Sequence, residues 1–417
     1  NIKREAQVDV EAVVSDIVTD IRARGDQALI DYTSRFDRFE ITAETMRITP
    51  EEVAAALTNC GQDQLDALQL AAKRIRAFHE KQLPEDLNYE DQDGVKLGLK
   101  WGPVEAVGMY VPGGLASYPS SVLMNAIPAQ VAGVGELIMV VPTPGDEISP
   151  AVLASAYLTG VDRLFRIGGA QAIAALAYGT HTVPRVDKIV GPGNIYVAAA
   201  KKQVFGDVGI DMIAGPSEVV VICDAGADPD WVAMDLFAQA EHDEQAQAIA
   251  IFLDRQMLER VEKAISRLLS GMERRTIIEK SLAGQGALIE VASIGEAINL
   301  ANRIAPEHLE LMVADPQPLL EQVRHAGAIF CGYHSGESLG DYCAGPNHVL
   351  PTAGTARFSS PLGVYDFQKR SSVIHCSPAG AAALSPVASA LARAEKLTAH
   401  ARSAEYRGQS TGSGEDV

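Results

Sequence analysis

Hydrophobic residues recur with a helical period through the first part of the chain. Between Val8 and Ile21, apolar positions follow the 3.6-residue spacing of an amphipathic helix. Gly25 interrupts this pattern, and a second helix is predicted directly after it. Thr49 and Pro50 are residue types typical of a helix N-cap and of the first helical position, which predicts a further helix there. We therefore expect the first hundred residues to form a helical layer.

From Glu105 onward, short apolar runs alternate with segments of helical period. The first group of apolar runs is EAVGMYV, ELIMVVP, RLFRIGG and KIVGPGN. A second group follows, with EVVVICD, AIAIFLD, GALIEV, LELMVAD and GAIFCGY. Apolar strands that alternate with helices are typical of parallel sheets with helices on both faces. The pattern therefore predicts an α/β fold with two sheets.

Beyond about Leu362 the pattern is mainly helical, as in LSPVASALARAEKLTAHARSAEYR. The last residues, GQSTGSGEDV, are rich in glycine, serine and acidic residues, and we expect them to be disordered. This end of the chain is predicted to be an arm rather than a third core.

Composition and charge narrow the class of protein. The chain has 417 residues, 47% of them hydrophobic, which is enough for two or three domains at roughly 150 residues each. A net charge of −19 would repel nucleic acids and anionic membranes, so neither is expected as a partner. No apolar run approaches the roughly 18 residues that span a bilayer, and NIKREAQVDV lacks the apolar core of a signal peptide, so we expect a cytoplasmic protein. The five cysteines lack CxxC spacing, which argues against a disulfide framework or a cysteine zinc site.

Glycine clusters follow several of the predicted strands. They are YVPGG (110–114), IGGAQA (167–172), GPGN (191–194) and AGPSE (214–218), the first three directly after strands. The GxGxxG fingerprint is absent, but each corner would let a ligand approach backbone N–H groups at the start of a helix. A tight turn explains any one corner. Three corners at the same end of one sheet favour a dinucleotide or a similarly extended ligand.

The stretch LFAQAEHDEQAQ places Gln239 and His242 three residues apart in a helix predicted to run from Pro229 through His242. Side chains at this spacing share one helix face and could converge on one ion. Such a pair alone is more often two solvated side chains on the surface or part of a helix cap. Asp228 and Pro229 are a plausible N-cap and first helical residue, so the helix starts shortly after a strand.

Two loop-like segments carry further candidate groups. In SLGDYCAGPNHVLPT, Asp341 and His348 lie among Gly and Pro residues, as ligand-binding side chains often do, although Asp341 could equally be a turn residue. In IAPEHLE, Glu307 and His308 stand side by side at an element boundary. The carboxylate could activate water and the imidazole could accept a proton, with a surface capping pair as the alternative.

The arm contributes His400, which follows Glu395 on a predicted helix, where a single histidine is usually a surface residue. Imidazole, carboxylate and amide ligands together fit zinc, or manganese or another divalent ion, better than magnesium or calcium. The residues alone therefore predict a soluble α/β enzyme that binds a nucleotide and a transition metal. They do not identify its substrate.

The sequence resembles the histidinol dehydrogenase family from the first helix to about Arg407. The segments that carry the resemblance are YVPGG, SSVLMNAIPAQVAG, GGAQAIAALAYGT, KIVGPGN, GIDMIAGPSEV, QAEHD, APEHLE, GDYCAGPNHVLPT and RAEKLTAH. The resemblance implies a bifunctional enzyme of histidine biosynthesis that oxidises L-histidinol through L-histidinaldehyde to L-histidine. Two NAD+ would be reduced and one water consumed.

The resemblance also implies an architecture of two incomplete Rossmann-like domains, one inserted in the other, with small terminal pieces that intertwine in a homodimer. Residues 1–8 would be the N-terminal piece, 9–109 and 219–362 the first domain, 110–218 the second, NAD-binding domain, and 363–417 a helical dimerisation arm with a flexible tail.

Site residues carry over from the resemblance position by position. The implied zinc ligands, one ion per subunit, are Gln239, His242, Asp341 and His400, the last of which the family takes from the partner subunit. His308 matches the general base, and Glu307 the residue that activates water. The implied substrate contacts are Ser217, Gln239, His242, His308, Asp341, Glu395 and His400, with His348 nearby. The implied NAD contacts are Tyr110, Gln171 and Asn194. In the family, zinc holds the imidazole and amino nitrogens of the substrate.

Other functions stay open at this point. A sister zinc dehydrogenase of the same fold could oxidise another polar alcohol, such as a sulfonated diol, although Glu395 and His400 suit an amino-imidazole substrate. A metal-dependent hydrolase would leave the glycine corners unused, and a scaffold protein would need none of these polar groups together. For aldehyde oxidation we expect water to be the nucleophile, because no cysteine lies in the sequence surroundings typical of a catalytic nucleophile. The alternative is an acyl-cysteine intermediate, for which Cys343, close to Asp341, is the nearest candidate.

Overall fold

The computed structural model describes residues 2–113 and 118–409, with side chains from residue 9 onward. Gly114 of the first glycine corner and residues 410–417 of the predicted tail lie outside these ranges. The chain divides into two compact units, unit 1 (Asn1–Gln82 and Val104–Phe367) and unit 2 (Leu83–Pro103 and Gln368–Val417).

Unit 1 contains a six-stranded sheet with the strand order β1-β6-β5-β4-β7-β8. Its strands are β1 (Arg47–Ile48), β4 (Ala106–Tyr110), β5 (Glu136–Val140), β6 (Arg163–Phe165), β7 (Lys188–Val190) and β8 (Gly209–Ile210). All pairings are parallel except that of β1 with β6. Along β5, Ile138 and Val140 enter one core while Leu137 and Met139 enter another. Because both faces are buried, the strands read as continuous apolar runs.

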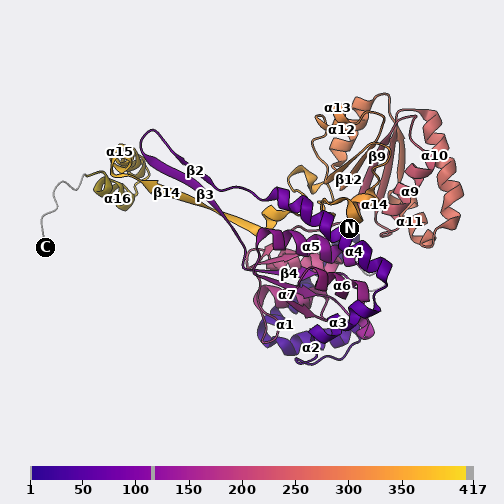
Figure 1. Cartoon of the computed structure of the whole chain (residues 1–417), viewed down its shortest axis with the longest axis horizontal. Coiled ribbons are helices and arrows are strands. Elements are labelled where there is room, and N and C mark those ends of the chain that lie inside the picture. The colour runs from indigo at the N-terminus through magenta and orange to yellow at the C-terminus, as the bar shows by residue number, and fades with distance from the viewer. Residues whose placement is uncertain (1, 114–117, 410–417) are drawn as a thin grey trace. The chain divides into compact units, whose positions relative to one another are not determined.

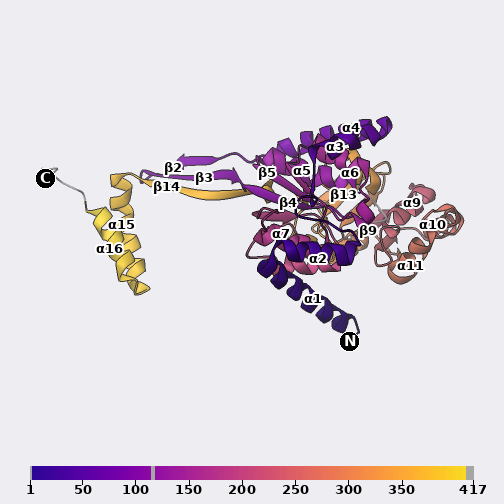
Figure 2. The same ribbon diagram turned by 90° about the horizontal axis from the view of Figure 1, so that it is seen from below.

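Helices cover both faces of this sheet (Figure 2). On one face lie α1 (Ile2–Arg24), α2 (Asp26–Asp37), α7 (Gly169–Tyr178) and α8 (Ile195–Val204). On the other lie α3 (Pro50–Asn59), α4 (Gln62–His79), α5 (Pro119–Ala132) and α6 (Pro150–Leu158). Helix α3 begins as predicted, with the Thr49 hydroxyl accepting from the Glu52 N–H and the Glu52 carboxylate accepting from the Thr49 N–H.

The predicted N-terminal helical layer is thus present as α1 to α4, and it packs on the helices of the six-stranded sheet. The domain boundaries stay a prediction. Residues 2–8 of the expected terminal piece begin helix α1.

A second, five-stranded parallel sheet in unit 1 has the order β11-β10-β9-β12-β13 (Figure 1). Its strands are β9 (Glu218–Cys223), β10 (Gln247–Phe252), β11 (Ala287–Glu290), β12 (His308–Met312) and β13 (Ala328–Cys331). Helices α9 (Pro229–Ala240), α10 (Arg255–Leu268) and α11 (Arg275–Gln285) lie on one face, and α12 (Ile294–Ile304) and α13 (Gln317–Leu320) on the other. The prediction of two α/β sheets is confirmed.

Short turns complete unit 1. They are the 3-10 turns η1 (Glu80–Gln82), η2 (Pro144–Asp146), η3 (Leu269–Gly271), η5 (Thr355–Arg357) and η6 (Val364–Phe367), the short helix α14 (Glu337–Leu339), and the π-helical turn η4 (Gly340–Ala344). π-Helical turns are rare in proteins overall, but those that occur are often found at functional sites. This turn carries Asp341.

Unit 2 is a three-stranded antiparallel sheet followed by two helices. The sheet has the order β14-β3-β2, with β2 (Leu87–Glu90), β3 (Val95–Pro103) and β14 (Gln368–Cys376), and the helices are α15 (Pro378–Ala394) and α16 (Thr398–Gly408). The helices after residue 376 were predicted, but the strands were not, because residues 87–103 were expected to be helical and the chain after Leu362 mainly helical. Strand β14 is exposed along almost its whole length, so it lacks the alternation that marks a half-buried strand. It forms by pairing Gln368 with Pro103, far away in sequence.

No helix in the described part of the chain is long and apolar enough to cross a bilayer. A cytoplasmic location stays a prediction. All five cysteines are free thiols in this structure.

Candidate active site

Glu307 and His308 lie at the amino end of the five-stranded sheet. His308 is the first residue of β12, the strand between β9 and β13, and only 3% of its surface is exposed. Glu307 precedes it and is 7% exposed. The alternative of a surface capping pair is therefore wrong, because both side chains are buried in unit 1.

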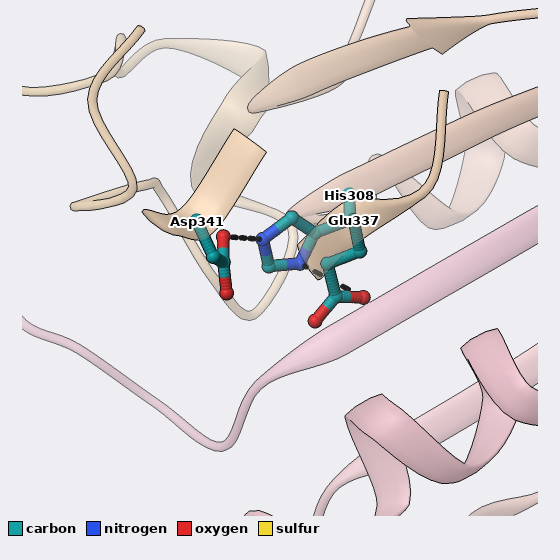
Figure 3. Close-up of side chains that lie close together, drawn as sticks. All are labelled: His308, Glu337 and Asp341. Carbon is teal, nitrogen blue, oxygen red and sulfur yellow. Dashed lines mark ion pairs between the residues drawn. The ribbon is translucent and has the colours of Figure 1, made fainter. Parts of the chain in front are cut away.

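Carboxylates surround the His308 ring (Figure 3). Its Nε2 lies 3.5 Å from Asp341 Oδ1, and its Nδ1 lies 3.9 Å from Glu337 Oε2. Nδ1 also donates to the main-chain oxygen of Glu218 at 3.1 Å and lies 3.8 Å from Glu307 Oε2. The potential ligand atoms of His308, Glu337 and Asp341 all lie within 4.8 Å of one another, so this cluster could hold a cation.

Burial and mutual charge shift the protonation of these groups. Burial raises the pKa of Glu307 to about 7, although the charge of His308 opposes the shift. Burial likewise raises the pKa of Glu337 to about 8. For His308, burial alone would lower the pKa, but the charges of Glu337, Glu307 and Asp341 outweigh it and raise the pKa to about 10. Burial would raise the pKa of Asp341, yet its hydrogen bond to His308 and the charge of that ring lower it. The site thus has two carboxyl groups that titrate near neutral pH.

Asp341 and His348 are held by the loop that follows α14. His348 Nδ1 donates to the main-chain oxygen of Asp341 at 3.0 Å, and burial lowers the pKa of His348. The side chain of Asp341 is 18% exposed and faces His308 rather than its own backbone. The alternative of a simple turn residue is therefore not supported.

Gln239 and His242 come from the end of α9. The helix begins as predicted, with Asp228 as its N-cap and Pro229 as its first residue, but it ends at Ala240, so His242 lies just beyond it rather than within it. Gln239 is fully buried, and neither its Oε1 nor its Nε2 has a hydrogen-bond partner among the described residues. His242 Nδ1 donates to the Ala238 carbonyl at 2.9 Å, which leaves Nε2 with a free lone pair. The charge of His242 also lowers the pKa of Asp341, so the two are within electrostatic reach.

Sequence reasoning missed three carboxyl groups close to these residues, of which Glu310 and Glu337 are buried and Asp235 is half-buried. Asp235 precedes Gln239 by one turn of α9, Glu310 follows His308 on β12, and Glu337 precedes Asp341 in the same loop. The Asp235 and Glu310 carboxyls interact, and each affects the pKa of the other. Glu310 Oε1 also accepts the Glu337 N–H at 2.8 Å.

Burial raises the pKa of Asp235 to about 6, and it raises that of Glu310 well above its usual range. The sequence shows that α9, β12 and the Asp341 loop contain acidic residues, but it does not show that these residues lie close together.

The three glycine corners open at the carboxyl ends of β4, β6 and β7 in the six-stranded sheet, as predicted. The Tyr110 hydroxyl accepts from the Gly169 N–H at 3.1 Å, and burial raises the pKa of Tyr110 to about 12. A Cβ on Gly191, whose φ is +107°, would lie 2.1 Å from the Tyr110 carbonyl oxygen, so only glycine fits there.

Two predicted cofactor residues lie at the same corners. Gln171 is 1% exposed, and its Nε2 has no partner within the described ranges. Asn194 caps helix α8 by accepting from the Tyr196 and Val197 N–H groups, which is a structural role of its own.

Sequence reasoning also missed Lys201 and Asp211 at the third corner. Lys201 Nζ donates to the Gly191 carbonyl, and Asp211 Oδ2 accepts the Gly191 N–H.

The remaining predicted residues are not part of the His308 cluster. Ser217 lies just before β9, where its carbonyl accepts the Gln247 N–H. Glu395 and His400 belong to unit 2, where Glu395 ends α15 and His400 lies in α16, and both are exposed. Their contribution to a site stays a prediction.

The two α/β sheets, the glycine corners and the buried histidine with carboxylates define an α/β enzyme, and comparison with known proteins gives its family. The family model of histidinol dehydrogenase matches residues 2–408. Histidinol dehydrogenase of Pseudomonas syringae pv. syringae is 62% identical over 395 residues, which cover 94% of this chain and 88% of the relative. That of Chromobacterium violaceum is 62% identical over 399 residues, covering 95% and 92%. The crystal structure of histidinol dehydrogenase from Elizabethkingia anophelis superposes with a TM-score of 0.94 at 36% identity, covering 97% of this chain and 93% of the other. The chain belongs to the histidinol dehydrogenase family and is an oxidoreductase.

Proposed function

We propose that this protein oxidises L-histidinol through L-histidinaldehyde to L-histidine, with transfer of two hydrides to two NAD+ and consumption of one water. The observation that carries the proposal is the buried Glu307–His308 pair in a chain that belongs to this family. A hydrolase that used the same polar groups would leave the glycine corners without a role. In a dehydrogenase, the glycine corners can bind the NAD+ that accepts the hydride.

We propose that Gln239, His242 and Asp341 hold a zinc ion, together with His400 of the partner subunit. The fit rests on the buried, unpartnered amide of Gln239, because a buried polar group without a partner costs free energy that a bound ligand would recover. His242 supports it with an Nε2 whose tautomer is set by the Ala238 carbonyl. When bound there, zinc would supply a fixed charge that orients the imidazole and amino nitrogens of the substrate.

His308 is proposed as the general base that takes the alcohol proton as the first hydride leaves the substrate carbon. A base must be neutral, and the surrounding carboxylates raise the pKa of His308 to about 10. A cation held by Asp341 would cancel the stabilisation that this carboxylate gives the imidazolium, and a proton on Glu337 would do the same. The pKa of His308 would then fall toward its usual value of about 6.5.

Glu307 is proposed to activate the water that adds to the aldehyde carbon. Its carboxylate takes a proton from that water as the oxygen adds to the aldehyde carbon, which gives a gem-diolate. The gem-diolate loses the second hydride to a second NAD+ and becomes the carboxylic acid of histidine, which releases its proton to solvent. A pKa of about 7 suits this role, because a base is most effective when its pKa lies near the working pH. The water route needs no cysteine.

Tyr110, Gln171 and Asn194 are proposed to contact NAD+ at the glycine corners. The buried, unpartnered Nε2 of Gln171 supports this assignment. Unit 2 is proposed as the dimerisation arm, and it exposes large apolar side chains, among them Val387 (58%), Leu391 (63%) and Tyr406 (71%). Apolar side chains gathered on one helical hairpin are typical of a surface that another chain covers.

The test is the number of NADH formed per L-histidinol consumed, before and after treatment with a chelator, and again after zinc is restored. We expect two NADH with histidine as the product, loss on chelation and recovery with zinc. A folded, zinc-loaded dimer that leaves histidinol unchanged would overturn the proposal and favour a sister dehydrogenase that acts on another alcohol.

A further inference from the structure

Helix α4 caps the π-helical turn that carries Asp341. Arg74 Nε donates to the Cys343 carbonyl at 2.7 Å, and Nη2 of the same guanidinium donates to the Ala344 carbonyl at 3.0 Å. These two carbonyls end the turn, so no later helical turn follows to supply their N–H donors. The fork of one guanidinium therefore satisfies both acceptors with charge-assisted hydrogen bonds.

The chain then leaves the turn in close contact with the same helix. Gly345 has a φ of +128°, and a Cβ added there would lie 3.2 Å from the Arg74 carbonyl oxygen and 3.3 Å from Phe78 Cβ. The left-handed backbone and the close approach both favour glycine. The end of the turn is thus pressed against the helix that supplies the guanidinium.

Helix α4 contacts the loop a second time beyond Gly345. His79 is fully buried, and its Nδ1 donates to the Ile75 carbonyl at 2.8 Å, which leaves Nε2 as an acceptor 3.5 Å from the amide nitrogen of Asn347. The next residue, His348, donates back to the carbonyl of Asp341. The loop is therefore held by α4 on both sides of Gly345, with Asp341 on one side and His348 on the other.

We infer that Arg74 is a positioning residue that fixes the backbone carrying Asp341, and so the geometry of the metal and substrate site. The inference rests on the role proposed for Asp341. Arg74 reaches only main-chain oxygens of the turn, so it acts through Asp341 and not on substrate or cofactor. Without the fork, the turn is free to shift, and the Asp341 carboxylate loses its fixed direction toward His308.

The test compares two arginines of the same helix. Arg74→Met keeps an aliphatic stem but removes both donors. The matched control is Arg76→Met, because Arg76 Nη2 donates at 2.6 Å to Gln130 Oε1 and does not touch the turn. Each variant is measured for its zinc dissociation constant by chelator competition, for amide hydrogen exchange over residues 340–348, and for KM and kcat with histidinol.

For Arg74→Met we expect zinc binding to weaken by about 10- to 100-fold, as for other groups that orient metal ligands. Exchange over residues 340–348 should speed up, while Arg76→Met matches the wild type in both readouts. Arg74→Lys should recover part of the loss, since one ammonium can reach one carbonyl but lacks the fork.

Wild-type zinc affinity and wild-type exchange in Arg74→Met would overturn the inference, as would equal losses in Arg76→Met. If wild-type protein neither binds zinc nor oxidises histidinol, the proposed function fails, and the exchange comparison still decides whether Arg74 holds the turn.

Discussion

The ion pair of Lys201 and Asp211 hydrogen-bonds the backbone of the GPGN corner, and its loss should destabilise the protein measurably. The two side chains are 3% and 1% exposed and contact one another directly. Lys201 Nζ donates to the Gly191 carbonyl at 3.0 Å, while Asp211 Oδ2 accepts the Gly191 N–H at 2.8 Å. Both backbone polar groups of Gly191 therefore depend on one buried pair. Lys201→Met removes the cation and keeps the aliphatic volume.

The expected cost follows from leaving the Asp211 carboxylate buried without its counter-charge. Removing one partner of a buried pair costs about 3–5 kcal/mol. Here the carboxylate keeps N–H donors from Gly191 and Met212, which places the expected loss at the lower end, about 3 kcal/mol. The double variant Lys201→Met/Asp211→Asn removes the charge as well, so it should lose less than the single variant.

Chemical and thermal unfolding of wild type, the single variant and the double variant measure this, with Lys202→Met as the control. Lys202 pairs with Glu11 at the surface, where the side chains are 63% and 46% exposed, so its loss should cost less than about 1 kcal/mol. If the corner binds NAD+ as proposed, Lys201→Met should also raise KM for NAD+ more than it lowers kcat. A loss below about 1 kcal/mol in Lys201→Met, or a double variant less stable than the single one, would refute the reasoning.

Three further predictions concern the site. His308→Asn should slow histidinol oxidation by about 100-fold or more, whereas Glu307→Gln should chiefly slow histidinaldehyde oxidation. Separate assays of the two half-reactions measure this. Equal losses of both half-reactions in both variants would contradict the division of roles. Asp341→Asn and His400→Asn should each abolish activity. If subunits of the two variants are exchanged, half of the dimers become hybrids with one intact site each, so about a quarter of the wild-type activity should return. No recovery in proven hybrid dimers would argue that each chain builds its own site. In protein stripped of metal, the free energy of unfolding should fall as pH rises from about 4 through 6, because burial raises the pKa of Asp235 to about 6 and also raises that of Glu310. Over this range the folded state binds more protons than the unfolded state. Glu310→Gln should flatten this dependence in urea titrations, and an unchanged slope would contradict the raised pKa of Glu310.

Most of unit 1 could be predicted because its signals are local. The central strands of both sheets are buried on both faces, so their apolar runs stand out against the helical segments between them. Thr49, Pro50, Asp228 and Pro229 mark helix starts through interactions with neighbours a few residues away. The strands of unit 2 lacked such a signal, because the exposed strand β14 exists only through its pairing with β3.

The sequence by itself determined the fold class, the family and the residue types of the candidate site, since motifs such as APEHLE and GDYCAGPNHVLPT are contiguous. Only the tertiary structure decided which groups meet. Glu337 became a neighbour of His308, Asp235 came to affect the pKa of Glu310, and Arg74 reached a carbonyl 269 residues away. The physical reason is that the pKa of a buried carboxyl and the partner of a guanidinium depend on distances across the fold, and these distances are set by packing rather than by spacing along the chain.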